Sequence, residues 1–155
     1  MLGSLSHDQI DGLLHEQYVG RIGCHTDGRT YVVPVTYVYQ GDAIYAHSAD
    51  GMKLRMMRAN PNVCFEVEHL EDMANWRTVI AWGTFEELHG GAARAAMGML
   101  VARLLPIVMS ETATMTDSMG VDEQRLAQVR GRKAVPFRVV LTEKTGRFER
   151  RASVR

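Results

Sequence analysis

The sequence has few cysteines, no long apolar segment and no net charge, and each absence excludes a class of protein. Only two cysteines, Cys24 and Cys64, occur in 155 residues, and their wide spacing inside expected strands does not indicate a disulfide framework or a zinc-ligand pair. Eighteen basic residues balance eighteen acidic ones, which leaves no broad positive field for nucleic acid or anionic lipid. The longest apolar stretch, around Met97 to Met109, is interrupted by Arg103 and is too short to span a bilayer. No nucleic-acid or membrane partner is therefore expected.

What is present is the composition of one compact domain. With 46% hydrophobic residues, a chain of 155 residues can bury one core and is too short for two ordinary domains, so we expect a single domain over residues 1–155. The N-terminus lacks a charged region followed by an apolar run, which predicts a cytoplasmic location. No metal site is expected, because Cys24, His25, Cys64 and His69 lack the close spacing of zinc or iron ligands.

Turn residues and alternating apolar residues divide the chain into short strands and a few helices. Ser6 followed by Gln9 has the form of a capping box, and Asp27-Gly28 and Gly41-Asp42 predict hairpin turns. Pro61 must end a short helix, because the residue before a proline avoids helical angles. The expected strands are Val19–His25, Tyr31–Gln40, Asp42–Ser48, Val63–His69, Thr78–Leu88 and Val135–Thr142. The expected helices are Ser6–Gln17, Lys53–Ala59, Ala92–Leu105 and Val121–Val129, with a polar stretch over Glu71–Asn75 and a loop over Ser110–Gly120.

Six short strands with flanking helices suit a small closed or partly closed barrel, which protects strand edges within one domain. The helix expected over Ala92–Leu105 is rich in Ala, Met and Leu and has few charges, so we expect it to be covered on most sides. Such a helix in a small protein indicates contact with a second subunit or with the end of the barrel.

The segment after the third expected strand has the form of a phosphate site. A polar loop leads into a helix at Lys53, so the N–H groups of Asp50, Gly51 and Met52 would point outward without helical partners. The ammonium of Lys53 would supply the countercharge. Solvated lysines also occupy such positions, and the preceding His47-Ser48 pair could be ordinary strand-end residues. From the residues alone, both interpretations stay open.

Four motifs, taken in order, carry a resemblance to a known family. They are V-P-V-T-Y-V-Y (Val33–Tyr39), I-Y-A-H-S-A-x-G-x-K (Ile44–Lys53), the N-P of Asn60 and Pro61, and T-V-I-A-W-G (Thr78–Gly83). Through them the chain resembles, from about Val19 to Leu88, the FMN-binding split β-barrels related to pyridoxamine 5′-phosphate oxidase, in the branch of the nitroimidazole-resistance proteins. The resemblance implies a mainly β, six-stranded split barrel with flanking helices. It also implies a homodimer with FMN in a groove between the subunits.

The resemblance assigns roles to individual residues. Lys53 would bind the flavin phosphate, with the pair His47-Ser48 against the phosphate or the ribityl chain. Pro34 removes one ladder hydrogen bond from its strand, so that strand must have an exposed edge or a bulge there, and a flat ring could use the free backbone groups. The expected FMN-binding residues are Val33, Pro34, Val35, Thr36, His47, Ser48, Met52, Lys53 and Thr78.

The implied function is a flavin-dependent oxidoreductase that acts on a small-molecule substrate, with NAD(P)H as the electron donor. The sequence assigns no acid, base or nucleophile. True pyridoxamine phosphate oxidases carry a longer C-terminal segment with a substrate motif, so vitamin B6 oxidation is not expected. Relatives often have a basic residue or histidine at the position of Met52, and its replacement by methionine argues against nitroimidazole reduction. One alternative is a flavin- or haem-binding sensor or carrier without turnover, for which His25, His47 and His69 are the available haem ligands. Another alternative is a split barrel that binds a deazaflavin, which would need a more basic groove.

Overall fold

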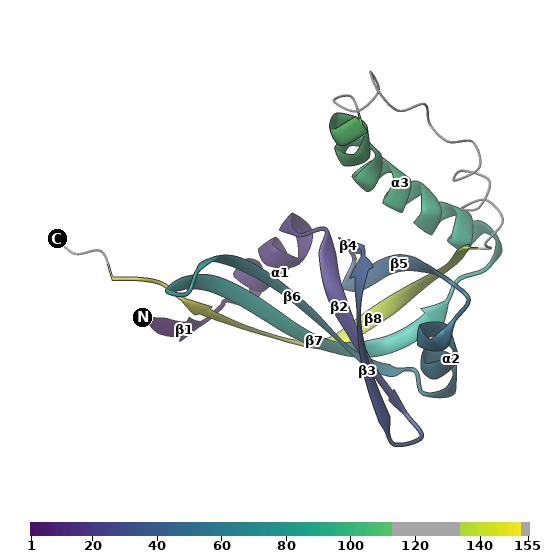
Figure 1. The fold of residues 1–155 in the computed structure, drawn as a ribbon, viewed down its shortest axis with the longest axis horizontal. Coiled ribbons are helices and arrows are strands. Elements are labelled where there is room, and N and C mark those ends of the chain that lie inside the picture. The colour runs from purple at the N-terminus through teal and green to yellow at the C-terminus, as the bar shows by residue number, and fades with distance from the viewer. Residues whose placement is uncertain (113–133, 153–155) are drawn as a thin grey trace.

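One curved antiparallel sheet forms the body of the protein, and the computed structural model describes residues 1–112 and 134–152 (Figure 1). The sheet has eight strands in the order β3-β2-β6-β7-β8-β5-β4, with β1 paired to the far end of β8. The strands are β1 (Leu2–Ser4), β2 (Val19–Thr26), β3 (Arg29–Thr36), β4 (Val38–Gln40), β5 (Ala43–Ala49), β6 (Asn62–Asp72), β7 (Asn75–Glu87) and β8 (Ala134–Glu149). The helices are α1 (His7–Glu16), α2 (Met52–Ala59) and α3 (Gly90–Thr112).

All six expected strands are present, and their boundaries are refined. The expected strand Tyr31–Gln40 is divided at Tyr37 into β3 and β4, and β1 was not expected. The polar stretch Glu71–Asn75 is largely strand and tight turn, because the Asp72 carboxylate accepts a hydrogen bond from Ala74 N at 2.7 Å and closes the β6–β7 hairpin. β8 continues to Glu149 instead of ending at Thr142, since β7 pairs with it as far as Trp76.

The local signals for turns and helix ends are confirmed. Ser6 caps α1: its hydroxyl accepts from Gln9 N at 3.3 Å, and its own N–H donates to Gln9 Oε1 at 2.8 Å. Both residues of the Asp27-Gly28 turn have positive φ, and so do both residues of Gly41-Asp42, as hairpins of the primed turn types require. α2 ends where Asn60 takes an extended conformation before the proline.

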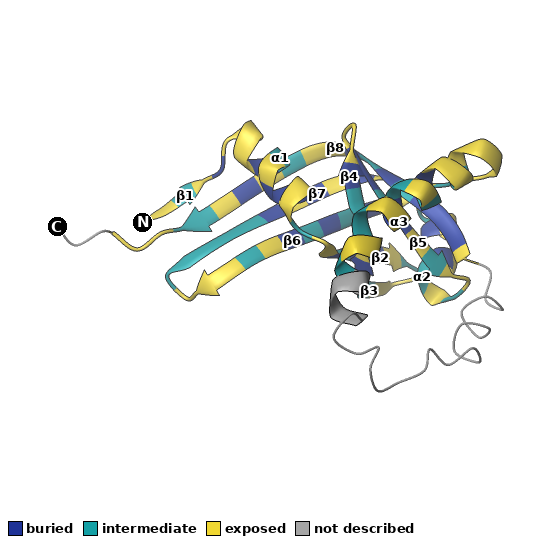
Figure 2. Cartoon of the chain, turned by 90° about the horizontal axis from the view of Figure 1, so that it is seen from above, coloured by how far each residue is buried: buried dark blue, intermediate teal, exposed yellow. Residues whose placement is uncertain are grey.

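The core lies inside the curve of the sheet, under α1 and α2. Inward and outward residues alternate along the strands, which gives the banded burial pattern of Figure 2. Tyr37 and Phe65 are fully buried and meet edge to face with ring centroids 4.9 Å apart. The barrel is split: within the described residues no ladder joins β3 to β4 or β5, so the two ends of the strand order do not close on each other.

α3 projects from the body of the molecule (Figure 1). Ala96 and Leu100 are buried against the sheet, whereas Val101 is 52% exposed and Leu105 is 50% exposed. Within the described residues the helix is thus covered on one side only, and the expected cover by a second subunit stays a prediction. The helix also begins earlier and continues through Thr112, so the expected loop start at Ser110 is helical; the expected helix Val121–Val129 lies outside the described residues. Among the helices of the described residues, none is long and apolar enough to cross a membrane.

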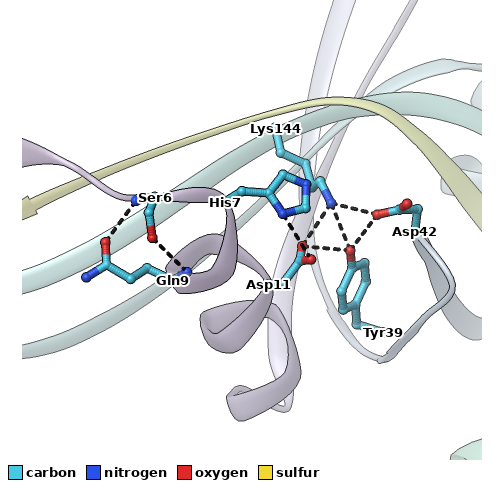
Figure 3. Close-up of polar contacts among 7 residues, drawn as sticks. All are labelled: Ser6, His7, Gln9, Asp11, Tyr39, Asp42 and Lys144. Carbon is cyan, nitrogen blue, oxygen red and sulfur yellow. Dashed lines mark hydrogen bonds and ion pairs between the residues drawn. The ribbon is translucent and has the colours of Figure 1, made fainter.

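A polar network fastens α1, the β4–β5 turn and β8 to one another (Figure 3). Lys144 Nζ lies 2.8 Å from Asp11 Oδ1, 2.6 Å from Asp42 Oδ1 and 3.0 Å from the Tyr39 hydroxyl. The lysine side chain is only 11% exposed. Burial raises the pKa of Tyr39 to about 12, so its hydroxyl keeps its proton and donates to the carboxylates.

Candidate functional site at the split of the barrel

The split is flanked by two free strand edges. β3 pairs with β2 alone among the described strands, so its other edge carries unpaired backbone groups. β5 pairs with β8 along its length, but β4 covers its other edge only through Ala43–Tyr45. The rest of that edge, Ala46–Ala49, has no strand partner among the described residues, and β3 contacts β5 across the opening. The exposed edge that Pro34 predicts is confirmed.

Eight of the nine predicted flavin residues lie around this opening. Val33, Pro34, Val35 and Thr36 end β3, with Val35 buried and Pro34 exposed. His47 and Ser48 lie on the free part of β5, and the Ser48 hydroxyl donates to Ala49 O at 2.9 Å. Met52 and Lys53 follow in the first turn of α2.

The N-terminus of α2 is open to a ligand. Its N-cap is Gly51, which has no side chain to bond the free N–H groups, and the first turn contains no acidic residue. The first backbone bond of the helix runs from Arg55 N to Gly51 O at 3.1 Å. The nearest carboxylate in the loop, Asp50, is instead bonded to Arg58 Nη1 at 3.1 Å. The positive end of the helix dipole is therefore left for another anion.

Lys53 supplies an unpaired cation at this helix end. The side chain is half-buried, and among the described residues it has no hydrogen bond and no ion pair. Burial lowers the pKa of the Lys53 ammonium, while the Cys24 thiol acts weakly in the opposite direction. Because a charge withdrawn from water is costly without a partner, this position favours an anionic ligand.

Arg58 holds the loop before α2 in place, a contact that the sequence motifs did not predict. Its guanidinium binds Glu87 with two hydrogen bonds, Nε to Oε2 at 2.8 Å and Nη2 to Oε1 at 2.9 Å, in addition to its bond to Asp50. The basic residue in the last turn of the helix was visible in the sequence. Its partner Glu87 could not be identified from the sequence, because the two residues are 29 positions apart and only the folded sheet brings them together.

Thr78 is the predicted residue that the structure does not bring to the split. It lies on β7, and two strands, β2 and β6, separate β7 from β3. Its hydroxyl donates to Glu66 Oε1 at 3.2 Å on the outer face of the sheet. The alternation along β7 places Ile80 and Trp82 on that face too, and they are 41% and 40% exposed. Packing explains the glycine of the same motif, Gly83, because a Cβ added there would lie 2.3 Å from the carbonyl oxygen of Val140.

The outer face also carries a shallow groove of about 370 Å³ beside Trp82 and the exposed Val32. A second cavity of about 290 Å³ lies at the far end of the sheet, beside Trp76 and Phe148. Neither of these two cavities contains a predicted flavin residue. Within the described part of the chain, no three His, Cys, Asp or Glu residues are grouped to hold a metal ion.

Comparison with known proteins places the chain in a family. The family model described as pyridoxamine 5′-phosphate oxidase matches residues 6–147. The chain belongs to the pyridoxamine 5′-phosphate oxidase family.

Proteins of known structure share the fold of this chain over nearly its whole length. A FAD-binding protein from Mesorhizobium loti is 29% identical, with a TM-score of 0.66 and coverage of 96% of this chain and 98% of that one. A Bacteroides thetaiotaomicron protein provisionally assigned to 5-nitroimidazole antibiotic resistance has a TM-score of 0.68 at 17% identity, covering 96% and 87% of the two chains. An uncharacterized protein of Rhizobium meliloti, RA0666, is 30% identical over 84 residues, which span 54% of this chain and about half, 56%, of that protein.

Proposed function

We propose that this protein binds FMN at the split of the barrel and acts as a flavin-dependent oxidoreductase. The observation that carries the proposal is the unpaired, half-buried ammonium of Lys53 at the uncapped N-terminus of α2. A terminal phosphate fits this donor set, which combines one full positive charge with free backbone N–H groups. The FAD-binding relative from Mesorhizobium loti supports a flavin as the ligand class. One unpaired lysine favours the single phosphate of FMN over the diphosphate of FAD.

The two free strand edges would hold the remainder of the cofactor. Backbone N–H and C=O groups along Val33–Thr36 have no ladder partner on the open side of β3 among the described strands, and they can bind the polar rim of a flat ring. His47 and Ser48 lie on the part of β5 that β4 does not cover and would lie along the phosphate and ribityl chain. A bound flavin would supply the redox chemistry, accepting electrons from NAD(P)H and passing them to a small-molecule substrate. The protein would contribute position and exclusion of water.

A second copy of the chain would complete this open site. Thr78 cannot serve the split of its own subunit across two intervening strands, but it shares the outer sheet face with exposed apolar residues. Burying Val32, Ile80 and Trp82 between two copies would remove apolar surface from water and bring Thr78 toward the partner's flavin. Arg21 on this face pairs with Glu66 and Glu68, so the patch carries both signs of charge and can face a copy of itself.

Titration of the apo-protein with FMN, FAD and riboflavin, followed by flavin fluorescence, tests the cofactor assignment. Lys53→Ala should weaken FMN binding by about 1.5–3 kcal/mol, which is about 10- to 150-fold in Kd, because it removes a charged hydrogen bond to the phosphate. Riboflavin lacks the phosphate, so its affinity should be unchanged by the substitution. The matched control is Arg55→Ala, which removes an exposed cation two residues later in the same helix. Tighter binding of FAD than of FMN, or equal FMN affinity in Lys53→Ala, would contradict the proposal.

A further inference from the structure

One carboxylate lies within local reach of the proposed phosphate site. Asp50 is the only acidic residue from Ala43 to Pro61, and it directly precedes Gly51, the N-cap of α2. Aspartate side chains often accept a hydrogen bond from the backbone N–H two residues later, here that of Met52, and the helix dipole favours a negative charge near a helix N-terminus. Lys53 follows three residues after Asp50. Asp50 is therefore an internal anion that can compete with a phosphate for the same groups.

The structure holds this carboxylate on Arg58, in the last turn of α2. Asp50 Oδ1 lies 3.1 Å from Arg58 Nη1, and among the described residues no side chain bonds the N-cap of α2. Arg58 is itself fixed by Glu87 of β7, which accepts from Nε at 2.8 Å and from Nη2 at 2.9 Å. The sheet thus sets the position of the guanidinium, and the guanidinium sets the position of Asp50.

Stability alone does not account for the contact between Arg58 and Asp50. The two side chains are 38% and 64% exposed. An ion pair so exposed to water contributes little to the free energy of unfolding. What the contact changes is the location of one negative charge, beside a helix end that must stay free if an anion is to bind there.

We propose that Arg58 is a positioning residue of the phosphate site: by holding Asp50, it keeps an internal carboxylate from competing with the phosphate for Lys53 and the N-terminus of α2. This inference rests on the proposed function and extends it to the control of the same site. A released Asp50 carboxylate would bond the free N–H groups and would repel a phosphate by its like charge. The competition concerns the phosphate only, so it should affect FMN and not riboflavin.

Flavin fluorescence titration of the apo-protein with FMN and riboflavin, on Arg58→Gln, Asp50→Ala and the double variant, tests this role. Arg58→Gln should weaken FMN binding by about three- to tenfold in Kd, the range expected from a carboxylate at a helix N-terminus. Asp50→Ala keeps the backbone N–H and should change FMN affinity by less than about twofold, because its carboxylate is already held by Arg58. In the double variant the loss caused by Arg58→Gln should disappear, since no competing carboxylate is left.

Arg138→Gln is the matched control. It removes another arginine that is 38% exposed, whose Nε lies 2.7 Å from Oε2 of Glu86, the residue before Glu87 on β7. FMN affinity should not change, because this ion pair holds no carboxylate next to the N-terminus of α2. Circular dichroism checks that each variant is folded, as the exposure of both arginines leads us to expect.

The pattern of affinities separates this inference from the proposed function. An equal loss of FMN affinity in Arg58→Gln and in the double variant, or no loss in Arg58→Gln, would overturn the inference, and FMN binding that still depends on Lys53 would leave the proposed function standing. A parallel loss of riboflavin affinity in Arg58→Gln would also overturn it, because it would show that Arg58 supports the fold of the whole site. Absence of FMN binding to the wild type would overturn both.

Discussion

Lys144 Nζ lies 2.8 Å from Asp11 Oδ1, and this contact joins the last strand to the first helix across 133 residues of sequence. The lysine points to the inner side of β8, where an alternating pattern calls for an apolar residue. It is tolerated there because Asp42 and Tyr39 complete its hydrogen bonding (Figure 3). The network thereby fixes β8 and the β4–β5 turn relative to α1.

Replacing this lysine should destabilise the fold. Lys144→Met removes charged hydrogen bonds and leaves the Asp11 carboxylate facing an apolar side chain, so we expect a loss of about 2 kcal/mol in the free energy of unfolding. Urea denaturation followed by circular dichroism measures it. Glu143→Gln changes the neighbouring exposed residue and should cost less than about 0.5 kcal/mol. Equal midpoints for the two variants would contradict a structural role for the network.

The stabilisation from this network should disappear in acid. Burial alone would raise the pKa of Asp11, but the hydrogen bonds from Lys144 and Tyr39 outweigh it and lower that pKa below the ordinary 3.8. Hydrogen bonds from the same two residues to Asp42 lower the pKa of Asp42. A carboxylate whose pKa is depressed by folding stabilises the protein above its unfolded pKa, and this contribution is lost as the pH falls through its folded pKa. The stability difference between wild type and Lys144→Met should thus be full at pH 6 and shrink below about pH 3.8. A difference that stays constant down to pH 2 would rule out this electrostatic origin.

The outer sheet face should mediate a dimer. Light scattering of the FMN-loaded protein is expected to give about twice the chain mass of 17.4 kDa. Trp82→Glu places a charge in the centre of the proposed contact and should yield monomers that bind FMN more weakly, because the partner's contribution is lost. Val101→Glu is the matched change on the exposed side of α3 and should leave the dimer intact. The opposite pattern would assign the subunit contact to α3.

Catalysis and storage can be told apart by anaerobic reduction. If the flavin turns over, NADH or NADPH should bleach its absorbance, and air or an added acceptor should restore it. Dithionite provides the control, since it reduces an accessible flavin without a nucleotide site. A flavin that stays oxidised with both nucleotides over many minutes, but is reduced by dithionite, would favour the sensor or carrier alternative. The visible spectrum of the purified protein separates flavin from haem before this experiment begins.

The sequence by itself determined the local structure and the place of the candidate site. Short-range chemistry specifies these features: the Ser6 and Gln9 side chains reach each other within one helical turn, positive φ suits Asp27-Gly28 and Gly41-Asp42, and Pro61 stops α2. The motifs from Val33 to Lys53 are likewise contiguous, so the strand edge, the loop and the helix N-terminus could be placed without knowing the fold.

Only the tertiary structure decided which of these residues share a site. Strand order places β2 and β6 between Thr78 and β3, and no local pattern encodes that order. The inward Lys144 breaks the alternation that marks a strand, and its partners come from the first helix and a distant turn, so the length of β8 could not be read from its residues. The unpaired state of Lys53 was also invisible, because it depends on Arg58 having already bound the nearby carboxylates of Asp50 and Glu87. Contacts between residues far apart in the chain are set by the packing of the whole sheet, and they determine which charges remain free for a ligand.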